Sequence, residues 1–182
     1  MFEELKEQVC QANLDLVSQG LVTLTWGNVS GLAEDYKHIV IKPSGVSYAE
    51  MKPEHMVVVD LKGNVVEGKL LPSSDTWTHI ILYRDFKGIR GITHTHSMYA
   101  TMFAQARMEI PCLGTTHADH FNGPVPLTRP LTESEVDEAY EMNTGNVIVE
   151  RFQKLDFFSM PAALVAGHGP FTWGMDPNDA VK

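Results

Sequence analysis

The segment Gly91-Ile92-Thr93-His94-Thr95-His96-Ser97 decides how this chain is interpreted. Its β-branched residues favour a strand. Side chains along a strand alternate between faces, so His94 and His96 point the same way and form a ready pair of metal ligands. A third histidine, His168, lies in a Gly-His-Gly-Pro loop, and a carboxylate, Asp75, follows two serines upstream. Three histidines and one acid are a ligand set for a divalent metal, and zinc is the expected ion.

The rest of the chain predicts helices and strands in alternation. Apolar spacing and capping residues predict helices over residues 2–19, 72–83 and 99–106, one from 133 with an interruption at Gly145, and a last one from 176. Apolar and β-branched runs predict strands over 21–26, 38–41, 56–60, 65–68 and 162–166. We therefore expect an α/β fold.

Composition narrows the class of protein. The chain has 182 residues, a net charge of -9 and 43% hydrophobic residues, as in a globular domain. It has no cluster of Lys and Arg and no apolar run of roughly 18 residues, so we expect neither nucleic-acid nor membrane binding. Cys10 and Cys112 have no CxxC spacing, which favours buried free thiols in a reducing compartment. A cytoplasmic location is expected.

Three loop segments could bind an anion, although each has a simpler structural explanation. Lys42-Pro43-Ser44-Gly45 offers an ammonium group, a hydroxyl and free backbone N–H groups, but as a lone pattern it is a turn. Ser73 or Ser74 is a good N-cap for the following helix, and a helix N-terminus with two hydroxyls is also a phosphate site. Asn28 follows a glycine, where the backbone can turn or approach a ligand closely.

Another polar segment could supply proton transfer. Asp119 lies between His117 and His120 in a loop dense in polar groups. Such a carboxylate could act as a general acid or base, while the two histidines could equally be plain surface residues.

Taken together and in order, these motifs resemble L-ribulose-5-phosphate 4-epimerases, members of the class II sugar-phosphate aldolase superfamily. The resemblance covers nearly the whole chain. It is carried by residues 25–30, 41–46, 72–76, 91–97, 114–119 and 168–171. Asp75 favours the epimerase branch, since the aldolases usually carry Glu there. The run Thr-Thr-His-Ala-Asp that ends at Asp119 favours the same branch.

The resemblance implies a fold and a set of partners. The fold is a single three-layer α/β domain over residues 1–182, with a central, mostly antiparallel sheet and helices on both faces. The expected assembly is a homotetramer with active sites between subunits. The expected substrate is a small sugar phosphate of pentose catabolism.

The resemblance also implies roles for individual residues. Zinc is expected on His94, His96 and His168, with Asp75 in the fourth direction or beside it. Asp119 is expected to be one of two proton-transfer groups. The substrate phosphate is expected at Ser44, Gly45, Ser73 and Ser74, with Asn28 and Lys42 nearby.

The implied reaction interconverts L-ribulose 5-phosphate and D-xylulose 5-phosphate at C4. It proceeds by retro-aldol cleavage and recombination through a metal-stabilised enediolate. An alternative is a class II aldolase or lyase acting on another sugar phosphate, such as L-fuculose 1-phosphate. A non-catalytic domain like the adducin head would be expected to lack the three histidines.

Two features depart from the resemblance. His120 stands where many epimerases carry Tyr after the aspartate. Family members also continue for several tens of residues beyond this point, with a helix and a second catalytic group, a Tyr. We therefore expect this chain to lack the family's C-terminal segment and one acid/base partner.

Overall fold

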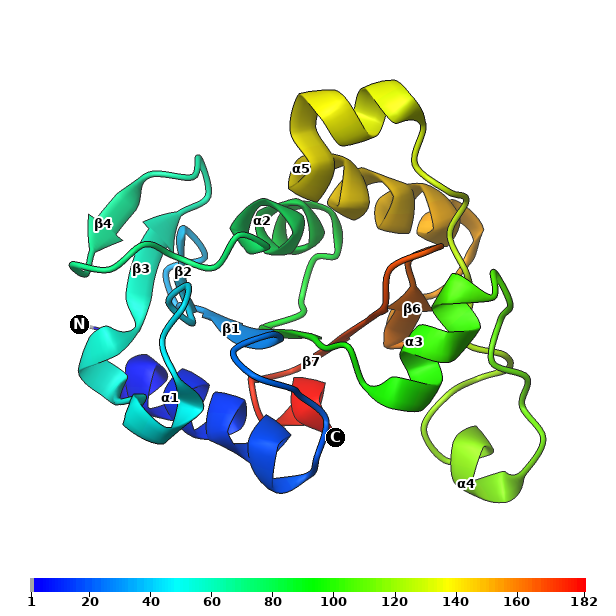
Figure 1. Ribbon diagram of the computed structural model, residues 1–182, viewed down its shortest axis with the longest axis horizontal. Coiled ribbons are helices and arrows are strands. Elements are labelled where there is room, and N and C mark those ends of the chain that lie inside the picture. The colour runs from blue at the N-terminus through cyan, green and yellow to red at the C-terminus, as the bar shows by residue number, and fades with distance from the viewer. Residues whose placement is uncertain (1) are drawn as a thin grey trace.

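The computed structural model describes residues 2–182, and a seven-stranded sheet lies at its centre (Figure 1). The strands run in the order β4-β3-β2-β1-β5-β7-β6, and each neighbouring pair is antiparallel. Their bounds are β1 Asn28–Leu32, β2 His38–Ile41, β3 Val57–Asp60, β4 Val65–Glu67, β5 Gly91–His94, β6 Ala162–Leu164 and β7 Pro170–Gly174. The expected antiparallel sheet is confirmed.

Helices cover both faces of this sheet, which confirms the three layers. Figure 1 shows α1 on one face and α2 with α5 on the other. The helices are α1 Glu3–Ser18, α2 Thr76–Asp85, α3 Met98–Gln105, α4 Thr115–Ala118 and α5 Glu133–Arg151. Single 3-10 turns are formed by Tyr48–Glu50, Pro53–His55, Phe152–Lys154 and Asp179–Val181. No helix within residues 2–182 combines the length and apolar character needed to cross a bilayer.

Alternation along the strands explains the two apolar layers. Ile39 and Ile41 of β2 belong to the core that includes residues of α2, and Val40 between them belongs to the core under α1. Successive strand residues point to opposite faces, and all three of these side chains are fully buried. A strand buried on both faces has a continuous apolar sequence rather than an alternating one.

The expected strand over residues 21–26 is wrong. The chain is irregular there, with Leu24 at a φ of 55° and 72% exposed, and with Trp26 54% exposed. An apolar run forms a strand only where a neighbour buries it, and these side chains face solvent. The strand begins instead at Asn28.

Other local expectations also need correction. Helix α5 runs through Gly145 without interruption, and its kink lies at Ala139. A Cβ at position 145 would lie 2.7 Å from the Cβ of Ile81, so the glycine allows α5 to approach α2 closely. The helix expected from 176 is only the single turn Asp179–Val181. Both cysteines are free, but Cys112 is exposed rather than buried.

The close approach at Gly91 gives a test of the fold. A Cβ there would lie 2.1 Å from the carbonyl oxygen of Asp176, a backbone atom that cannot move aside cheaply. We predict that Gly91→Ala lowers the free energy of unfolding by about 2–3 kcal/mol, as overpacking does, measured by urea denaturation. Gly114→Ala is the matched control, because a Cβ at Gly114 meets nothing within 4 Å. Equal stability of the two variants would mean that β5 and the C-terminal segment are not packed as described.

Candidate active site

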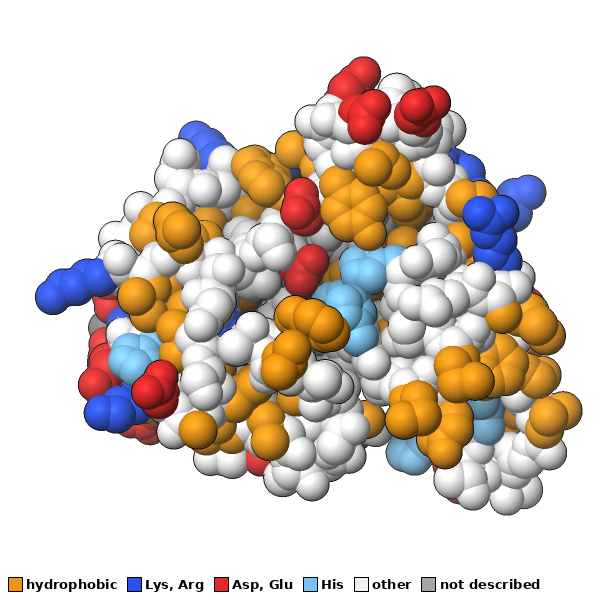
Figure 2. Space-filling model, viewed as in Figure 1, with side chains coloured by type: hydrophobic (Ala, Val, Ile, Leu, Met, Phe, Trp, Pro, Cys, Tyr) orange, Lys and Arg blue, Asp and Glu red, His pale blue; other side chains and the backbone are white. Residues whose placement is uncertain are grey.

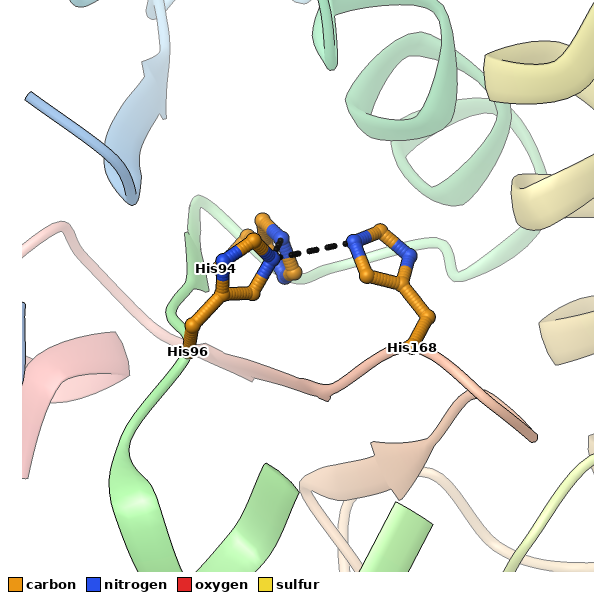
Figure 3. Close-up of side chains that lie close together, drawn as sticks. All are labelled: His94, His96 and His168. Carbon is orange, nitrogen blue, oxygen red and sulfur yellow. Dashed lines mark hydrogen bonds between the residues drawn. The ribbon is translucent and has the colours of Figure 1, made fainter. Parts of the chain in front are cut away.

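Three histidine side chains converge at one end of β5. His94 is the last residue of β5, His96 follows two residues later, and His168 lies in the loop between β6 and β7. The Nε2 atom of His96 lies 3.2 Å from that of His94 and 3.1 Å from that of His168. Figure 3 shows the three rings turned toward one another. One ligand atom of each residue lies within 4.8 Å of the others.

The donor arrangement fits a divalent metal ion. Three nitrogens at the usual zinc distance in tetrahedral directions lie about 3.3 Å apart, close to the Nε2 separations found here. The Nδ1 atom of His94 lies 2.9 Å from the carbonyl oxygen of Pro170. A carbonyl can only accept, so Nδ1 carries the proton and the Nε2 lone pair faces the site. Such a partner is what metal-binding histidines usually have.

The electrostatics favour the neutral imidazoles that bind metals. Burial and the nearby His94 ring lower the pKa of His168 to about 3, although Asp75 opposes the shift. Burial also lowers the pKa of His94, again against the effect of Asp75. Both rings are therefore neutral at pH 7, and no proton has to be removed before a metal binds.

The carboxylate expected in the metal set lies in the same pocket. Asp75 immediately precedes α2, and the Nδ2 atom of Asn28 donates a hydrogen bond of 2.6 Å to its Oδ2 atom. Burial would raise the pKa of Asp75, but His94, His79 and the Asn28 hydrogen bond together lower it. An ionised carboxylate therefore lies beside the histidines. The converging group within residues 2–182 contains the three histidines alone, so direct ligation by Asp75 stays a prediction.

A buried polar contact between β1 and α2 supports this carboxylate. Asn28 and Ser30 lie two residues apart on β1, and Asp75 and His79 lie one helical turn apart. Each strand residue contacts one helix residue, with Ser30 Oγ 2.7 Å from His79 Nδ1. His79 is fully buried, and burial lowers its pKa to about 3 despite the opposing effect of Asp75. It is therefore a neutral structural histidine.

The residues expected to bind phosphate lie in the same pocket as the three histidines. The pocket has a volume of about 270 Å³. Figure 2 shows histidine and acidic side chains in a hollow near the centre of the molecule. All six expected phosphate-binding residues line the pocket, namely Asn28, Lys42, Ser44, Gly45, Ser73 and Ser74. Segments from three distant parts of the chain thus meet beside the histidines.

Hydrogen bonds fix the two loops that carry these groups. The backbone N–H of Ser44 donates to the carbonyl of Leu71, and that of Ser73 donates to the carbonyl of Lys42. The expectation of a free N–H at Ser44 is therefore wrong, and its hydroxyl is the group left for a ligand. Gly45 has a φ of 71° and open space where a Cβ would lie, which suits a ligand that approaches the backbone.

Lys42 is a buried cation at the base of the pocket. It is 2% exposed, and its Nζ donates to the carbonyl of Thr25 at 2.9 Å. The same Nζ lies 4.9 Å from the ring centroid of Tyr48. Burial lowers the pKa of Lys42 to about 8, although Asp75 opposes the shift. Its ammonium group remains largely charged at pH 7, and it supplies positive charge to the pocket.

Asp119 lies elsewhere. It follows the short helix α4 and lines a different pocket, of about 290 Å³, together with Phe157 and Trp173. The structure therefore does not bring Asp119 to the histidines of its own subunit, and its catalytic role stays a prediction.

Five lining residues are not among the expected site residues, namely Thr25, Trp26, Gly27, Tyr140 and Glu141. Tyr140 and Glu141 come from α5, just after the kink at Ala139, and reach the pocket. The ring of Trp26 lies 6.2 Å from that of His96. Trp26 adjoins the Gly27-Asn28 pair and could have been found from it, whereas no motif surrounds Tyr140.

The chain matches the family described as Class II Aldolase and Adducin N-terminal domain over residues 7–182. It belongs to this family. Among curated relatives, L-ribulose-5-phosphate 4-epimerase UlaF from Salmonella paratyphi B is 54% identical over 179 residues, which cover 98% of this chain and 78% of the relative. The protein of the same name from Salmonella typhi matches equally well.

Solved structures of class II aldolases share the fold. An L-fuculose 1-phosphate aldolase has a TM-score of 0.81 at 29% identity, with 98% of this chain and 78% of that chain covered. The L-fuculose-1-phosphate aldolase from Thermus thermophilus has a TM-score of 0.73 at 27% identity, with 99% of this chain and 85% of that chain covered. The expected fold class is confirmed.

The buried His79 gives a prediction for pH dependence. Its pKa in the folded protein lies below the usual value of about 6.5. Below that pH the unfolded chain takes up a proton that the folded chain does not, so stability is lost as pH falls. For the metal-free protein, we predict a loss from His79 of about 1 kcal/mol per pH unit between pH 6.5 and 5. Urea denaturation across this range measures it.

His79→Gln is the variant that tests the assignment. This variant should be less stable at pH 7. Its free energy of unfolding should fall less steeply as pH decreases, because about one fewer proton is taken up on unfolding. An unchanged slope would show that His79 is not the buried neutral group.

Proposed function

We propose that this protein is a metal-dependent L-ribulose-5-phosphate 4-epimerase that uses zinc. The observation that carries the proposal is that one pocket holds both the three histidines and the six residues expected to bind phosphate. The identity of 54% to proteins of that name supports the same substrate.

The reaction explains why the pocket needs both a metal-binding group and a phosphate-binding group. The hydrogen on C4 of the sugar is not acidic, so the centre cannot be inverted by simple deprotonation. Cleavage of the C3–C4 bond, rotation of the aldehyde fragment and recombination avoid this difficulty. A bound divalent cation supplies Lewis acidity that stabilises the negative charge on the ketone fragment. The protein must hold both fragments while the aldehyde turns.

The three histidines provide a neutral ligand set. His94, His96 and His168 would hold the ion through Nε2 and leave coordination positions free for substrate oxygens, unlike a closed structural site. The net charge of such a centre is positive, and the ionised Asp75 beside it offsets part of that charge. Asn28 keeps this carboxylate in place through its hydrogen bond.

The opposite wall would hold the phosphate. The hydroxyls of Ser44, Ser73 and Ser74 can donate to phosphate oxygens, and Lys42 adds a fixed positive charge. Gly45 leaves room for the phosphate against the backbone. Because the phosphate belongs to the aldehyde fragment, this grip keeps the fragment bound through its rotation, and so contributes to catalysis as well as affinity.

We further propose that Asp119 acts in the active site of a neighbouring subunit of a homotetramer in the cytoplasm. Its distance from the pocket of its own chain supports this arrangement. The exposed apolar side chains on and near α3 support contacts between subunits, since such a surface is usually covered by a partner. They are Met98, Tyr99, Met102 and Leu113.

The direct test of the activity uses the zinc-loaded protein and L-ribulose 5-phosphate. We expect D-xylulose 5-phosphate to form and a chelator to abolish its formation, with recovery on addition of zinc. Accumulation of free glycolaldehyde phosphate and dihydroxyacetone without an epimer would instead support an aldolase. Turnover that is insensitive to the chelator would contradict the proposal.

Two substitutions distinguish the residues that bind zinc from those that bind the substrate phosphate. We expect His94→Ala to lower zinc affinity by at least about 100-fold, since even partners behind the ligands contribute about 10- to 100-fold. Ser44→Ala should instead weaken substrate binding and leave zinc affinity unchanged. Isothermal titration with zinc and with substrate measures both. His38→Ala is the control for zinc binding, because His38 lies at the opposite end of β2 from Lys42, beside Asp35. Full zinc affinity in His94→Ala would contradict the metal assignment.

Mixed oligomers test the role of Asp119. We expect His94→Ala and Asp119→Asn to be inactive alone, and their co-assembled mixture to regain activity. In a mixed assembly some sites combine an intact His94 with an intact Asp119 from another subunit. The regained fraction should be roughly a quarter, on random mixing of two subunits per site. An active Asp119→Asn homo-oligomer, or no recovery in the verified mixture, would contradict the proposal.

A further inference from the structure

The kink in α5 is held in place by side chains. Ala139 has a φ of -162° and a ψ of 67°, which breaks the helical hydrogen-bond ladder without a Pro or Gly at that position. Two side chains bond to backbone carbonyls on either side of the break. Thr78 Oγ1 of α2 donates to the carbonyl of Glu141 at 2.6 Å, and Asn143 Nδ2 donates to that of Glu135 at 2.9 Å. The kink is therefore a defined feature of the fold.

The residue after the kink contacts the metal centre. The hydroxyl of Tyr140 lies 3.1 Å from Nδ1 of His168, the ring nitrogen that points away from the other two histidines. The two ring centroids are 5.8 Å apart. Within residues 2–182, it is the one aromatic ring contact between α5 and the three histidines.

The distal ring nitrogens of His94 and His168 have different kinds of partner. The Nδ1 atom of His94 bonds to the backbone carbonyl of Pro170, inside the β5–β7 pair. His168 lies in a loop, next to Gly167 at a φ of 79°, and its Nδ1 partner is the Tyr140 side chain. Backbone hydrogen bonds hold this loop, including one from His168 N–H to the carbonyl of Val165. They leave the ring free to turn about its side-chain bonds, so the ring orientation depends on what holds its distal nitrogen.

The protons in this contact can be assigned. If Nε2 of His168 presents its lone pair to a metal, Nδ1 must carry the proton and donate it to the Tyr140 oxygen. The Tyr140 hydroxyl then keeps its own proton for another acceptor.

We propose that Tyr140 is a positioning residue that fixes the tautomer and orientation of His168, and that the kink held by Thr78 places it there. The kink in α5 thereby sets the metal affinity of the pocket. This inference rests on the metal centre of the proposed function, but it concerns metal binding and not the identity of the sugar.

The first experiment compares zinc binding by Tyr140→Phe and the intact protein, in competition with a chromophoric chelator. We expect affinity to fall about 10- to 100-fold, as when the partner behind a metal ligand is removed. With cobalt in place of zinc, the visible absorption bands should shift, because the histidine orientation changes. Tyr36→Phe is the matched control, since Tyr36 lies between β1 and β2 and is 59% exposed.

An affinity for Tyr140→Phe within about twofold of the intact protein, with unchanged cobalt bands, would overturn the proposal. That result would leave the proposed function standing, because the intact protein still binds zinc. Failure of the intact protein to bind zinc would overturn both. Circular dichroism and urea denaturation establish that each variant is folded before its affinity is read.

A second variant tests the kink. Thr78→Val removes the hydroxyl that bonds to the Glu141 carbonyl but keeps the side-chain shape. We expect it to weaken zinc binding as well, with little further loss when it is combined with Tyr140→Phe, because it acts through the same tyrosine. Zinc affinity of Thr78→Val equal to that of the intact protein, or fully additive losses in the double variant, would show that the kink does not act through Tyr140.

Discussion

The antiparallel pairing of β5 with β7 is the contact on which the active site depends. It places His94 opposite Phe171, and the ring of Phe171 stacks on that of His94 at 4.2 Å between centroids. The same pairing brings the loop before β7, with His168, to the end of β5. A slip of one residue would turn His94 to the other face of the sheet. The register of one strand pair therefore decides whether the three histidines meet.

Burial around this centre is balanced by charge and hydrogen bonding. An isolated buried carboxylate or ammonium group is costly in free energy. Asp75 has the Asn28 amide and two histidines around it, and Lys42 has backbone carbonyls and the Tyr48 ring. These contacts keep both charges in the pocket of the folded protein. The site is organised before any ligand binds, which reduces the cost of binding in entropy.

The sequence predicted the parts of the site that follow from local rules. The spacing of His94 and His96 follows from the two-residue period of a strand, and the buried runs in β2 and β3 predicted the sheet. It could not predict Tyr140, because the kink at Ala139 depends on Thr78, which lies on another helix. Residues 21–26 were misassigned for the same reason. Their apolar pattern suits a strand, but Leu24 and Trp26 are exposed, and burial is a property of the whole fold.

We propose that the three histidines and the serine loops form one site for a metal and a phosphate. Crystals grown with zinc and inorganic phosphate, measured at the zinc absorption edge, test it directly. We expect one strong anomalous peak within about 2 Å of the three Nε2 atoms, with phosphate density beside Ser44, Ser73 and Ser74. Zinc bound elsewhere, for example at His117 and His120, with no density among the serines, would contradict it.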